Sequence, residues 1–231
     1  MIIGVRSIEV EGTDMSSAEE IVSASGIREG SGYFSYNTGK AERAVLESVH
    51  TVEEIKITRS VFGKVRITVT EKKAIWYTEF FGNYLALSDA LEVIKSEESF
   101  KGYEDRGLVR LDLPVVHSAI LGRPIEFSDG DRDCSFIWSF LDEIRECELY
   151  KEGRIDQVCV ETKFEIFVVC DLKYKIKLGR YSSACFKLNK ARDVLRDETF
   201  SGEGKWEIDV SGAPDIVSRP EDQLDFEHLI P

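Results

Sequence analysis

The fold of this chain is decided first by residues 65–71, which read Val-Arg-Ile-Thr-Val-Thr-Glu. Apolar and polar side chains alternate along this stretch, a pattern typical of a β-strand with one buried face and one solvated face. Residues 52–59, Val-Glu-Glu-Ile-Lys-Ile-Thr-Arg, also favour a strand, and a turn near Phe62-Gly63 separates the two stretches. The sequence therefore predicts two consecutive strands before residue 75.

Upstream of these strands, the pattern predicts one more strand and a helix. Residues 8–11, Ile-Glu-Val-Glu, alternate in the same way, and Gly12 ends the alternation. Ser16 and Ser17 lie three residues ahead of two glutamates, which is the spacing of a capping box at the start of a helix. Gly26 is expected to end that helix.

A second helix is predicted to begin at Asn37 or Thr38, because either side chain can cap it. Its apolar stripe follows helical spacing and consists of Ala41, Ala44, Val45 and Val49. The first 75 residues thus read strand, helix, helix, strand, strand.

The stretch that follows is less uniform. Residues 76–94 fit either a hairpin around Ser88-Asp89 or one helix, and residues 96–107 read as a polar loop. Residues 109–113 alternate between polar and apolar side chains and predict a strand that Pro114 ends.

Beyond residue 130, one amphipathic helix is followed by a run of strands. The helix covers residues 136–144, and Asp131 or Asp133 is expected to start it. The later elements are strands at 155–160, 164–169 and 174–178, a short basic helix at 186–195 and a strand at 206–210.

Together these patterns predict an α+β fold in three parts. Residues 1–75 form a small β-α-α-β-β domain. Residues 76–220 form a larger, mostly antiparallel β domain with flanking helices. Residues 221–231 form an acidic tail without periodicity.

Composition and charge exclude several classes of protein. The 231 residues include 30 basic and 43 acidic side chains, a formal net charge of −13. Such a charge repels phosphate backbones, so nucleic acid is not an expected partner. The chain contains no run of about 18 apolar residues, so no membrane-spanning segment is predicted within it. Its length is sufficient to bury a core without a metal or a disulfide.

The cysteines do not form a recognisable motif. They are Cys134, Cys147, Cys159, Cys170 and Cys185, an odd number without a C-x-x-C pair. Two of them lie in apolar strand patterns, where a free cysteine is usually a small buried side chain. We therefore expect buried thiols.

A search for catalytic and metal-binding patterns yields no site. Residues 129–133 resemble the start of a calcium loop, but Cys134 and Phe140 stand where that loop needs glycine and glutamate. The histidines, His50, His117 and His228, show no metal-ligand spacing. A Cys–His nucleophile pair, such as Cys159 with His117, stays open because such partners are distant along a chain. We predict no catalytic, cofactor-binding or metal-binding residue, and no enzyme activity.

The first 76 residues resemble a POTRA domain. The resemblance rests on Ile8-Glu9-Val10-Glu11-Gly12, the helix at Glu19-Glu20-Ile21, the turn Gly26-Ile27-Arg28-Glu29-Gly30 and the helix that ends near Val49. It continues in the strand at 52–59, which ends in arginine, and in residues 65–74, which are similar to I-x-V-x-E-R-x-P-x-A. A POTRA domain implies the β-α-α-β-β fold.

The second half resembles the C-terminal β domain of the FtsQ/DivIB family. The similarity lies in the order and spacing of residues 174–179, Lys187-Leu188, Val194-Leu195, residues 206–211 and Arg219-Pro220. Together with the POTRA-like half, it covers about residues 5–222. The chain thus resembles the extracytoplasmic part of an FtsQ/DivIB protein.

This resemblance implies a non-catalytic scaffold of the division machinery that binds FtsB/DivIC and FtsL partners and helps to control septal peptidoglycan synthesis. It also implies a single-pass membrane anchor outside this chain, with the chain itself extracytoplasmic at the division septum. The alternative is a POTRA-type chaperone or substrate-docking module of a secretion or membrane-assembly system.

The resemblance also indicates where the partner binds. In the family, an FtsB segment pairs with the final edge strand of the sheet, which corresponds here to residues 213–220. The expected partner-binding residues in that strand are Asp215, Ile216, Val217, Ser218 and Arg219, and Lys187 and Lys190 on the preceding helix are expected to attract an acidic partner. An exposed edge offers N–H and C=O groups that an added strand satisfies. The competing interpretation is an ordinary half-buried strand beside a solvated basic face.

Overall fold

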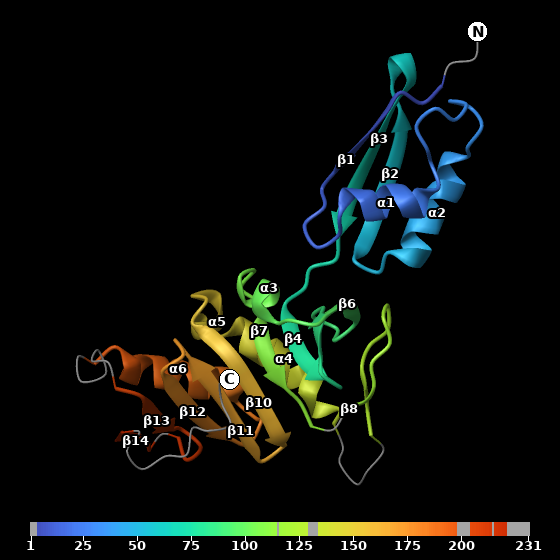
Figure 1. Ribbon diagram of the computed structural model, residues 1–231. Helices are drawn as coiled ribbons and strands as arrows, with labels where there is room; N and C mark the ends of the chain where they lie inside the picture. Colours follow the sequence, from blue (N-terminus) through green and yellow to red (C-terminus); the bar gives the residue numbers. More distant parts are fainter. Residues whose placement is uncertain (1–3, 115, 129–133, 198–203, 214, 221–231) are drawn as a thin grey trace. The chain divides into compact units, whose positions relative to one another are not determined.

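The computed structural model describes residues 4–114, 116–128, 134–197, 204–213 and 215–220 (Figure 1). The chain separates into two compact units, Met1–Lys73 and Ala74–Pro231. Each unit has its own hydrophobic core and its own main sheet.

The first unit confirms the predicted order of strand, helix, helix, strand, strand. Its elements are β1 (Ser7–Glu11), α1 (Ala18–Ser25), α2 (Thr38–Ser48), β2 (Val52–Arg59), the short 3-10 helix η1 (Val61–Gly63) and β3 (Lys64–Glu71). The sheet order is β1-β3-β2, in which β1 runs parallel to β3 and β2 runs antiparallel to it. The two long strands, β2 and β3, are those that alternate most clearly in the sequence.

Local capping explains where the two helices begin. The hydroxyl of Ser17 accepts the N–H of Glu20 at the start of α1, and the Asn37 side chain accepts the N–H of Lys40 at the start of α2. Gly26 ends α1 with a positive φ of 68°, which glycine adopts without strain. The predicted start of α1 at a capping serine and the first of the two alternative caps for α2 are therefore confirmed.

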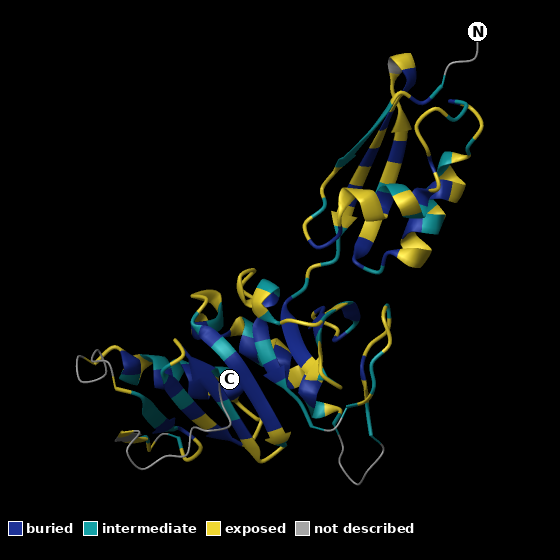
Figure 2. Cartoon of the chain, viewed as in Figure 1, coloured by how far each residue is buried: buried dark blue, intermediate teal, exposed yellow. Residues whose placement is uncertain are grey.

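The alternating strand supplies the floor of the first core. The side chains of Val65, Ile67 and Val69 on β3 are buried against those of Ile21 from α1 and Val45 from α2. Figure 2 shows the corresponding stripe pattern, with buried and exposed positions alternating along β3. Burial of apolar area on one face of the strand is what holds both helices on the sheet.

A single carboxylate joins the end of β3 to the loop after β1. The Glu71 side chain accepts the backbone N–H groups of Asp14, Met15 and Ser16 at 3.0, 2.6 and 2.9 Å. Burial alone would raise the pKa of Glu71, but these hydrogen bonds outweigh it and hold the pKa below its ordinary value. The charged form of Glu71 therefore stabilises the first unit.

The second unit is built on one large mixed sheet. Its strands are β4 (Trp76–Phe80), β5 (Asn83–Leu87), β6 (Val93–Glu97), β7 (Val109–Asp112), β10 (Ile155–Thr162), β11 (Glu165–Cys170), β12 (Tyr174–Gly179), β13 (Trp206–Asp209) and β14 (Val217–Pro220). Among the described residues they form the order β14-β13-β12-β11-β10-β7-β4-β5-β6. A separate two-stranded pair consists of β8 (Val116–Ser118) and β9 (Glu126–Phe127).

The helices α4 (Phe136–Glu146), α5 (Glu148–Lys151) and α6 (Ala184–Leu195) cover one face of this sheet. The short helix α3 (Lys101–Glu104) packs Tyr103 against Tyr77, whose side chain lies on the other face from that of Trp76. α4 and α6 pack Phe140, Ile144 and Leu188 onto the inward side chains of the strands, such as Val158 and Ile176. The helix at 136–144 and the basic helix near 186–195 were both predicted, although Asp131 and Asp133 lie outside the described residues.

Parallel pairings make the sheet less antiparallel than the sequence predicts. The pairs β4–β7, β7–β10 and β12–β13 are parallel, and the other five neighbouring pairs in the order are antiparallel. The chain passes through α3 between β4 and β7, through α4 and α5 between β7 and β10, and through α6 between β12 and β13. A helical crossover of this kind brings the next strand back in the same direction.

The ambiguous stretch at 76–94 resolves into strands. β5 and β6 form the hairpin around Ser88-Asp89, so the hairpin alternative is confirmed and the single helix is wrong. β4, a strand that the sequence did not single out, precedes this hairpin and pairs with β5. The loop expected at 96–107 contains the end of β6 and the short helix α3, whose Tyr103 is fully buried.

None of the five cysteines forms a disulfide in the described structure. Cys147, Cys159 and Cys170 are buried, while Cys134 and Cys185 are half-buried. Burial raises the pKa of Cys147 to about 11. The expectation of buried thiols is therefore met at three positions.

The hydrogen bonds of Glu71 generate a prediction about stability. Replacing Glu71 by glutamine removes the charge that three N–H groups share, and should lower the free energy of unfolding of the first unit by about 1–3 kcal/mol at pH 7. Because the folded pKa is lowered, this contribution is present above the ordinary pKa and is lost as the pH falls through the folded pKa. Urea unfolding of the whole chain at pH 7 and pH 3 measures it. Glu54→Gln, at an exposed position of β2, is the matched control; an equal loss in both variants would contradict the assignment.

Candidate partner-binding edge

The sheet of the second unit ends at β14, and no described strand lies beyond it (Figure 1). The predicted edge strand is therefore confirmed as an edge, but it is shorter than the sequence suggested. It begins at Val217 instead of Ala213, and Pro214 lies outside the described residues. The register with β13 pairs Val217 with Asp209 and Ser218 with Ile208.

Hydrogen bonds on β13 determine which backbone groups of β14 face outward. The N–H groups of Trp206 and Val210 donate to Lys173 and Lys177, so the even-numbered residues of β13 face β12. Backbone direction alternates along a strand, and the odd-numbered residues Glu207 and Asp209 must therefore face β14. Their partners in register are Arg219 and Val217.

Ser218 stands opposite Ile208, whose backbone N–H and C=O point toward β12. The N–H and C=O of Ser218 therefore point away from the sheet. Pro220, two residues further, also faces outward, and it has no N–H to offer. Proline at an outward position of an edge strand is the usual placement, because it costs the sheet no hydrogen bond. The edge thus offers a short docking length that ends at Pro220.

The side chains on this edge lie on two faces. Val217 is 48% exposed and lies on the same face as Asp209, while Ile216 is half-buried and packs against the core that the helices cover. Asp215 and Ser218 are exposed. A strand added here would contact Val217 on one face and Ser218 on the other.

At the other end of the sheet, the chain itself covers the beginning of β6 at Val93. The N–H of Val93 on β6 donates to Arg123, and the N–H of Gly122 donates to the carbonyl of Val93. The segment around residues 121–124 therefore takes up outward backbone groups of β6. Of the two ends of the sheet, β14 is the one without such a cover in the described part of the chain.

The two lysines expected beside the edge have different environments. Lys187 is 8% exposed, and its ammonium donates to the carbonyls of Leu178 and Arg180 at 2.9 and 2.8 Å. Burial lowers the pKa of Lys187. This lysine therefore tethers α6 to the end of β12, and its charge is not presented to a partner.

Lys190 is placed differently on the same helix. Asn189 and Arg192 face α5, where they contact Glu148 and Glu152. By helical periodicity, Lys190 lies on the flank of α6 that points away from α5. Its ammonium is 5.8 Å from the ring centre of the exposed Phe186. Of the two lysines, Lys190 is the one whose charge remains accessible.

The open possibility of a Cys–His nucleophile gains no support from the environment of Cys159. Its side chain is 3% exposed, and its thiol donates to Asp112 at 3.2 Å. Burial, together with the Asp112 charge, raises the pKa of Cys159, which keeps the thiol protonated. His117 lies on a different sheet, on β8. Gln157 and Arg110 also bond to Asp112, which makes this cluster a polar link between β7 and β10.

The described residues contain no group of three or more metal-ligating side chains that could hold an ion. The calcium-like stretch at 129–133 lies outside these residues. Among the described helices, none combines the length and the apolar character that crossing a bilayer requires.

Comparison with known proteins agrees with this architecture. Residues 3–72 match the family model of the FtsQ-type POTRA domain. Over 210 residues, the chain is 22% identical to the cell division protein DivIB of Clostridium botulinum, an alignment that covers 90% of this chain and 78% of that protein. Residues 3–72 thus form an FtsQ-type POTRA domain, and the chain as a whole is a distant homologue of the cell division protein DivIB.

These two similarities together cover both units. The FtsQ-type POTRA domain is the first unit, and the similarity to DivIB extends through the larger mixed sheet.

The direction of the β14 backbone generates a prediction about folding. Val217→Pro removes an N–H that faces β13, so it should destabilise the second unit by about 1 kcal/mol or more. Ser218→Pro removes an N–H that faces solvent and should leave thermal unfolding nearly unchanged. Thermal unfolding of both variants, followed by circular dichroism, measures the difference. A larger loss in Ser218→Pro than in Val217→Pro would show that the assigned direction is wrong.

Proposed function

We propose that this chain is a non-catalytic scaffold of the division machinery that binds FtsB/DivIC-like and FtsL-like proteins at the division septum. The partner adds a strand to β14, and the complex helps to control septal peptidoglycan synthesis. The chain is extracytoplasmic, and its parent protein is held in the cell membrane by a single-pass anchor. The proposal is supported by the match to the FtsQ-type POTRA domain, by the distant homology to DivIB and by the backbone geometry of the edge.

The observation that carries the proposal is the outward-facing backbone of Ser218 at an end of the sheet where no described strand lies beyond it. A partner strand satisfies these groups without moving β13, because the inner side of β14 is already paired. Asp215, Ile216, Val217, Ser218 and Arg219 form the docking segment. Lys190 supplies a positive charge on the flanking helix, whereas Lys187 is removed from the expected site by its burial.

The second unit already uses strand addition by its own chain. At the β6 end, residues 121–124 occupy the outward groups of Val93. A partner strand at β14 would complete the opposite end in the same way. Pro220 limits the docking length and protects the free protein against indiscriminate edge pairing.

Ser218→Pro tests the docking edge directly. The variant lacks the outward N–H and should weaken binding of an FtsB/DivIC-like peptide by about tenfold or more, since it removes a hydrogen bond and crowds the added strand. Ser218→Ala, which keeps the N–H, should bind as the unaltered protein does. Isothermal titration calorimetry gives both affinities. Equal affinity in the two variants would remove β14 as the site.

Lys190→Glu tests the charged flank. Reversal of an accessible charge should slow association with an acidic partner segment several-fold at low salt, and the difference should shrink at high salt. Lys56→Glu, an exposed lysine of β2 in the first unit, carries the same charge change away from the site. Stopped-flow association at two ionic strengths measures the effect. An equal slowing in both variants would assign the effect to net charge alone.

A further inference from the structure

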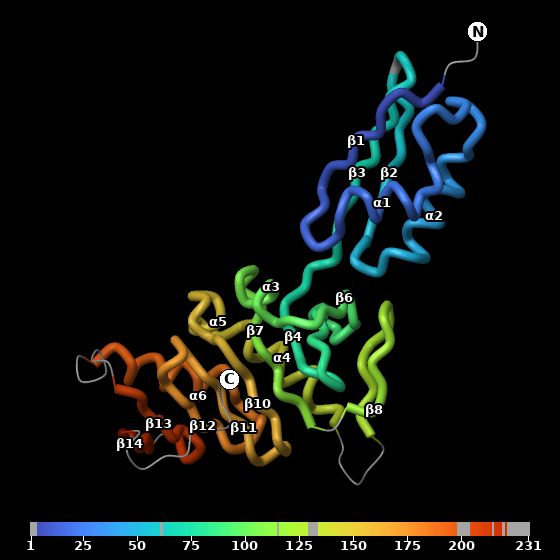
Figure 3. The backbone as a smooth tube through the Cα atoms, viewed as in Figure 1, coloured from blue at the N-terminus to red at the C-terminus, as the bar shows by residue number. Residues whose placement is uncertain are grey.

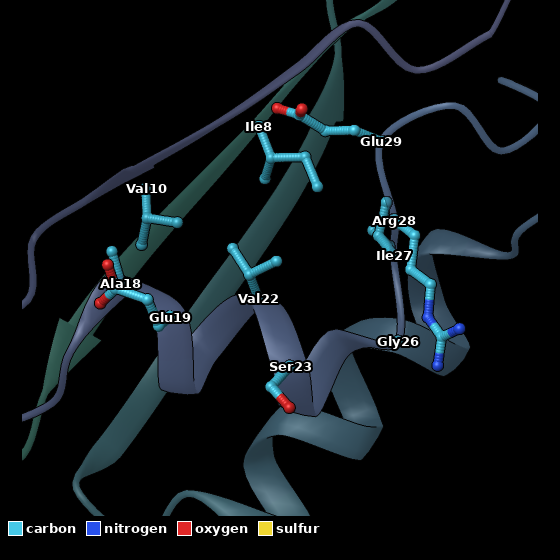
Figure 4. Close-up of a pocket in the computed structure, with 10 residues that line it drawn as sticks. All are labelled: Ile8, Val10, Ala18, Glu19, Val22, Ser23, Gly26, Ile27, Arg28 and Glu29. Atoms are coloured by element: carbon cyan, nitrogen blue, oxygen red, sulfur yellow. The ribbon is translucent and has the colours of Figure 1, made fainter.

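A groove lies beside β1 in the first unit, on the face of the sheet where α1 packs (Figure 4). It has a volume of about 570 Å³. The side chains of Ile8 and Val10 on β1 and of Val22 on α1 point into the groove (Figure 4). Figure 3 traces the backbone of β1 and α1. All three side chains are half-buried. The groove therefore has an apolar floor that the first unit itself leaves partly uncovered.

The strand that borders the groove is an edge. In the order β1-β3-β2, no described strand lies on the outer side of β1. The N–H of Arg6 donates to Gly63, so the even-numbered residues face β3. By alternation, the backbone groups of Ser7 and Glu9 face outward, away from the sheet.

The chain uses the beginning of this same edge. The N–H of Val5 donates to the carbonyl of Ser31, and the N–H of Gly30 donates to the carbonyl of Val5. A bridge between Gly4 and Gly32 continues this pairing. The outer side of β1 thus accepts strand-like pairing at Val5, and the next outward positions, Ser7 and Glu9, remain available for the same geometry.

Charge at the two ends of the groove selects its occupant. Figure 4 shows the Glu29 carboxylate beside Ile8 and the Glu19 carboxylate near Val10, while the Arg28 side chain points away from the floor. The apolar floor is therefore flanked by a negative charge at each end. An occupant that matches both features carries apolar side chains in the middle and basic side chains at its ends.

We propose that the groove binds an extended peptide segment that adds a strand to β1. Alternate side chains of such a strand point into the groove, so the fitting pattern is basic-x-apolar-x-apolar-x-basic. The two apolar residues lie at the level of Ile8 and Val10, and the basic ends meet Glu29 and Glu19. This site is separate from the proposed β14 edge, because it belongs to the other unit and uses a different strand.

The test uses the whole chain and a synthetic peptide, Lys-Thr-Val-Thr-Val-Thr-Lys. Nuclear magnetic resonance with labelled protein should show saturable shifts at the amides of Ser7 and Glu9 and in α1. Glu9→Pro removes an outward N–H and should weaken binding about tenfold or more, as should Val22→Lys, which places a charge on the floor. The Ser218→Pro variant should bind this peptide unchanged.

A matched pair of variants tests the charge. Glu19→Lys should weaken binding several-fold, whereas Glu20→Lys, an exposed neighbour that does not line the groove, should not. Both substitutions lie in the first turn of α1, so their effects on the helix are alike. A peptide with glutamate at both ends should fail to bind.

Three results would overturn the proposal. The first is equal affinity in Glu9→Pro and the unaltered chain. The second is a set of shifts confined to the second unit. The third is concentration-dependent self-association that Glu9→Pro abolishes while the peptide does not bind, which would identify a second copy of this chain as the occupant of the edge.

Discussion

Backbone groups at a strand edge must be paired, covered or left to solvent, and this constraint organises both units of the protein. In the larger sheet, residues 121–124 cover β6 at Val93, whereas β14 has an outward N–H at Ser218 and a proline two residues later. In the first unit, Val5, just before β1, is paired with residues 30–31, and no described strand lies beside the outward groups of Ser7 and Glu9. In both sheets, the chain itself therefore pairs only part of the edge backbone.

The packed faces hold these edges in place. α4 and α6 bury one face of the large sheet, and the ammonium of Lys187 fastens α6 to the end of β12. On the opposite face, Asp112 connects β7 with β10 through Gln157 and Cys159. A buried polar group that is fully bonded fixes the geometry of its neighbours. Asp112, Cys159 and Lys187, which a search for catalytic residues would select, thus connect neighbouring elements of the sheet and its helices.

The similarity to DivIB is consistent with the proposed role as a binding protein. An edge strand binds through main-chain hydrogen bonds, which require direction and room but no particular side-chain chemistry. The proposed sites at β14 and β1 therefore depend on backbone geometry, which a search for side-chain motifs does not detect. They lie in separate units and use different strands.

Much of the local structure follows from the sequence alone. The alternation at residues 65–71, the cap at Ser17 and the apolar stripe of α2 depend on hydrogen bonds and periodicities that span a few residues, so the pattern is sufficient to place them. The family resemblance also placed the final strand within residues 213–220, and β14 occupies Val217–Pro220.

The tertiary structure decided the rest, because it depends on pairings between residues far apart in the sequence. Periodicity in the sequence does not show which strands pair in parallel, that β4 belongs to the sheet, or that residues 121–124 cover β6 at Val93. Lys187 and Lys190 look alike in the sequence, and only the packing of α6 on β12 buries the first and leaves the second half-buried. The hydrogen bonds between β12 and β13 determine that the backbone N–H and C=O of Ser218 point outward, although Ser218 itself lies on the neighbouring strand β14.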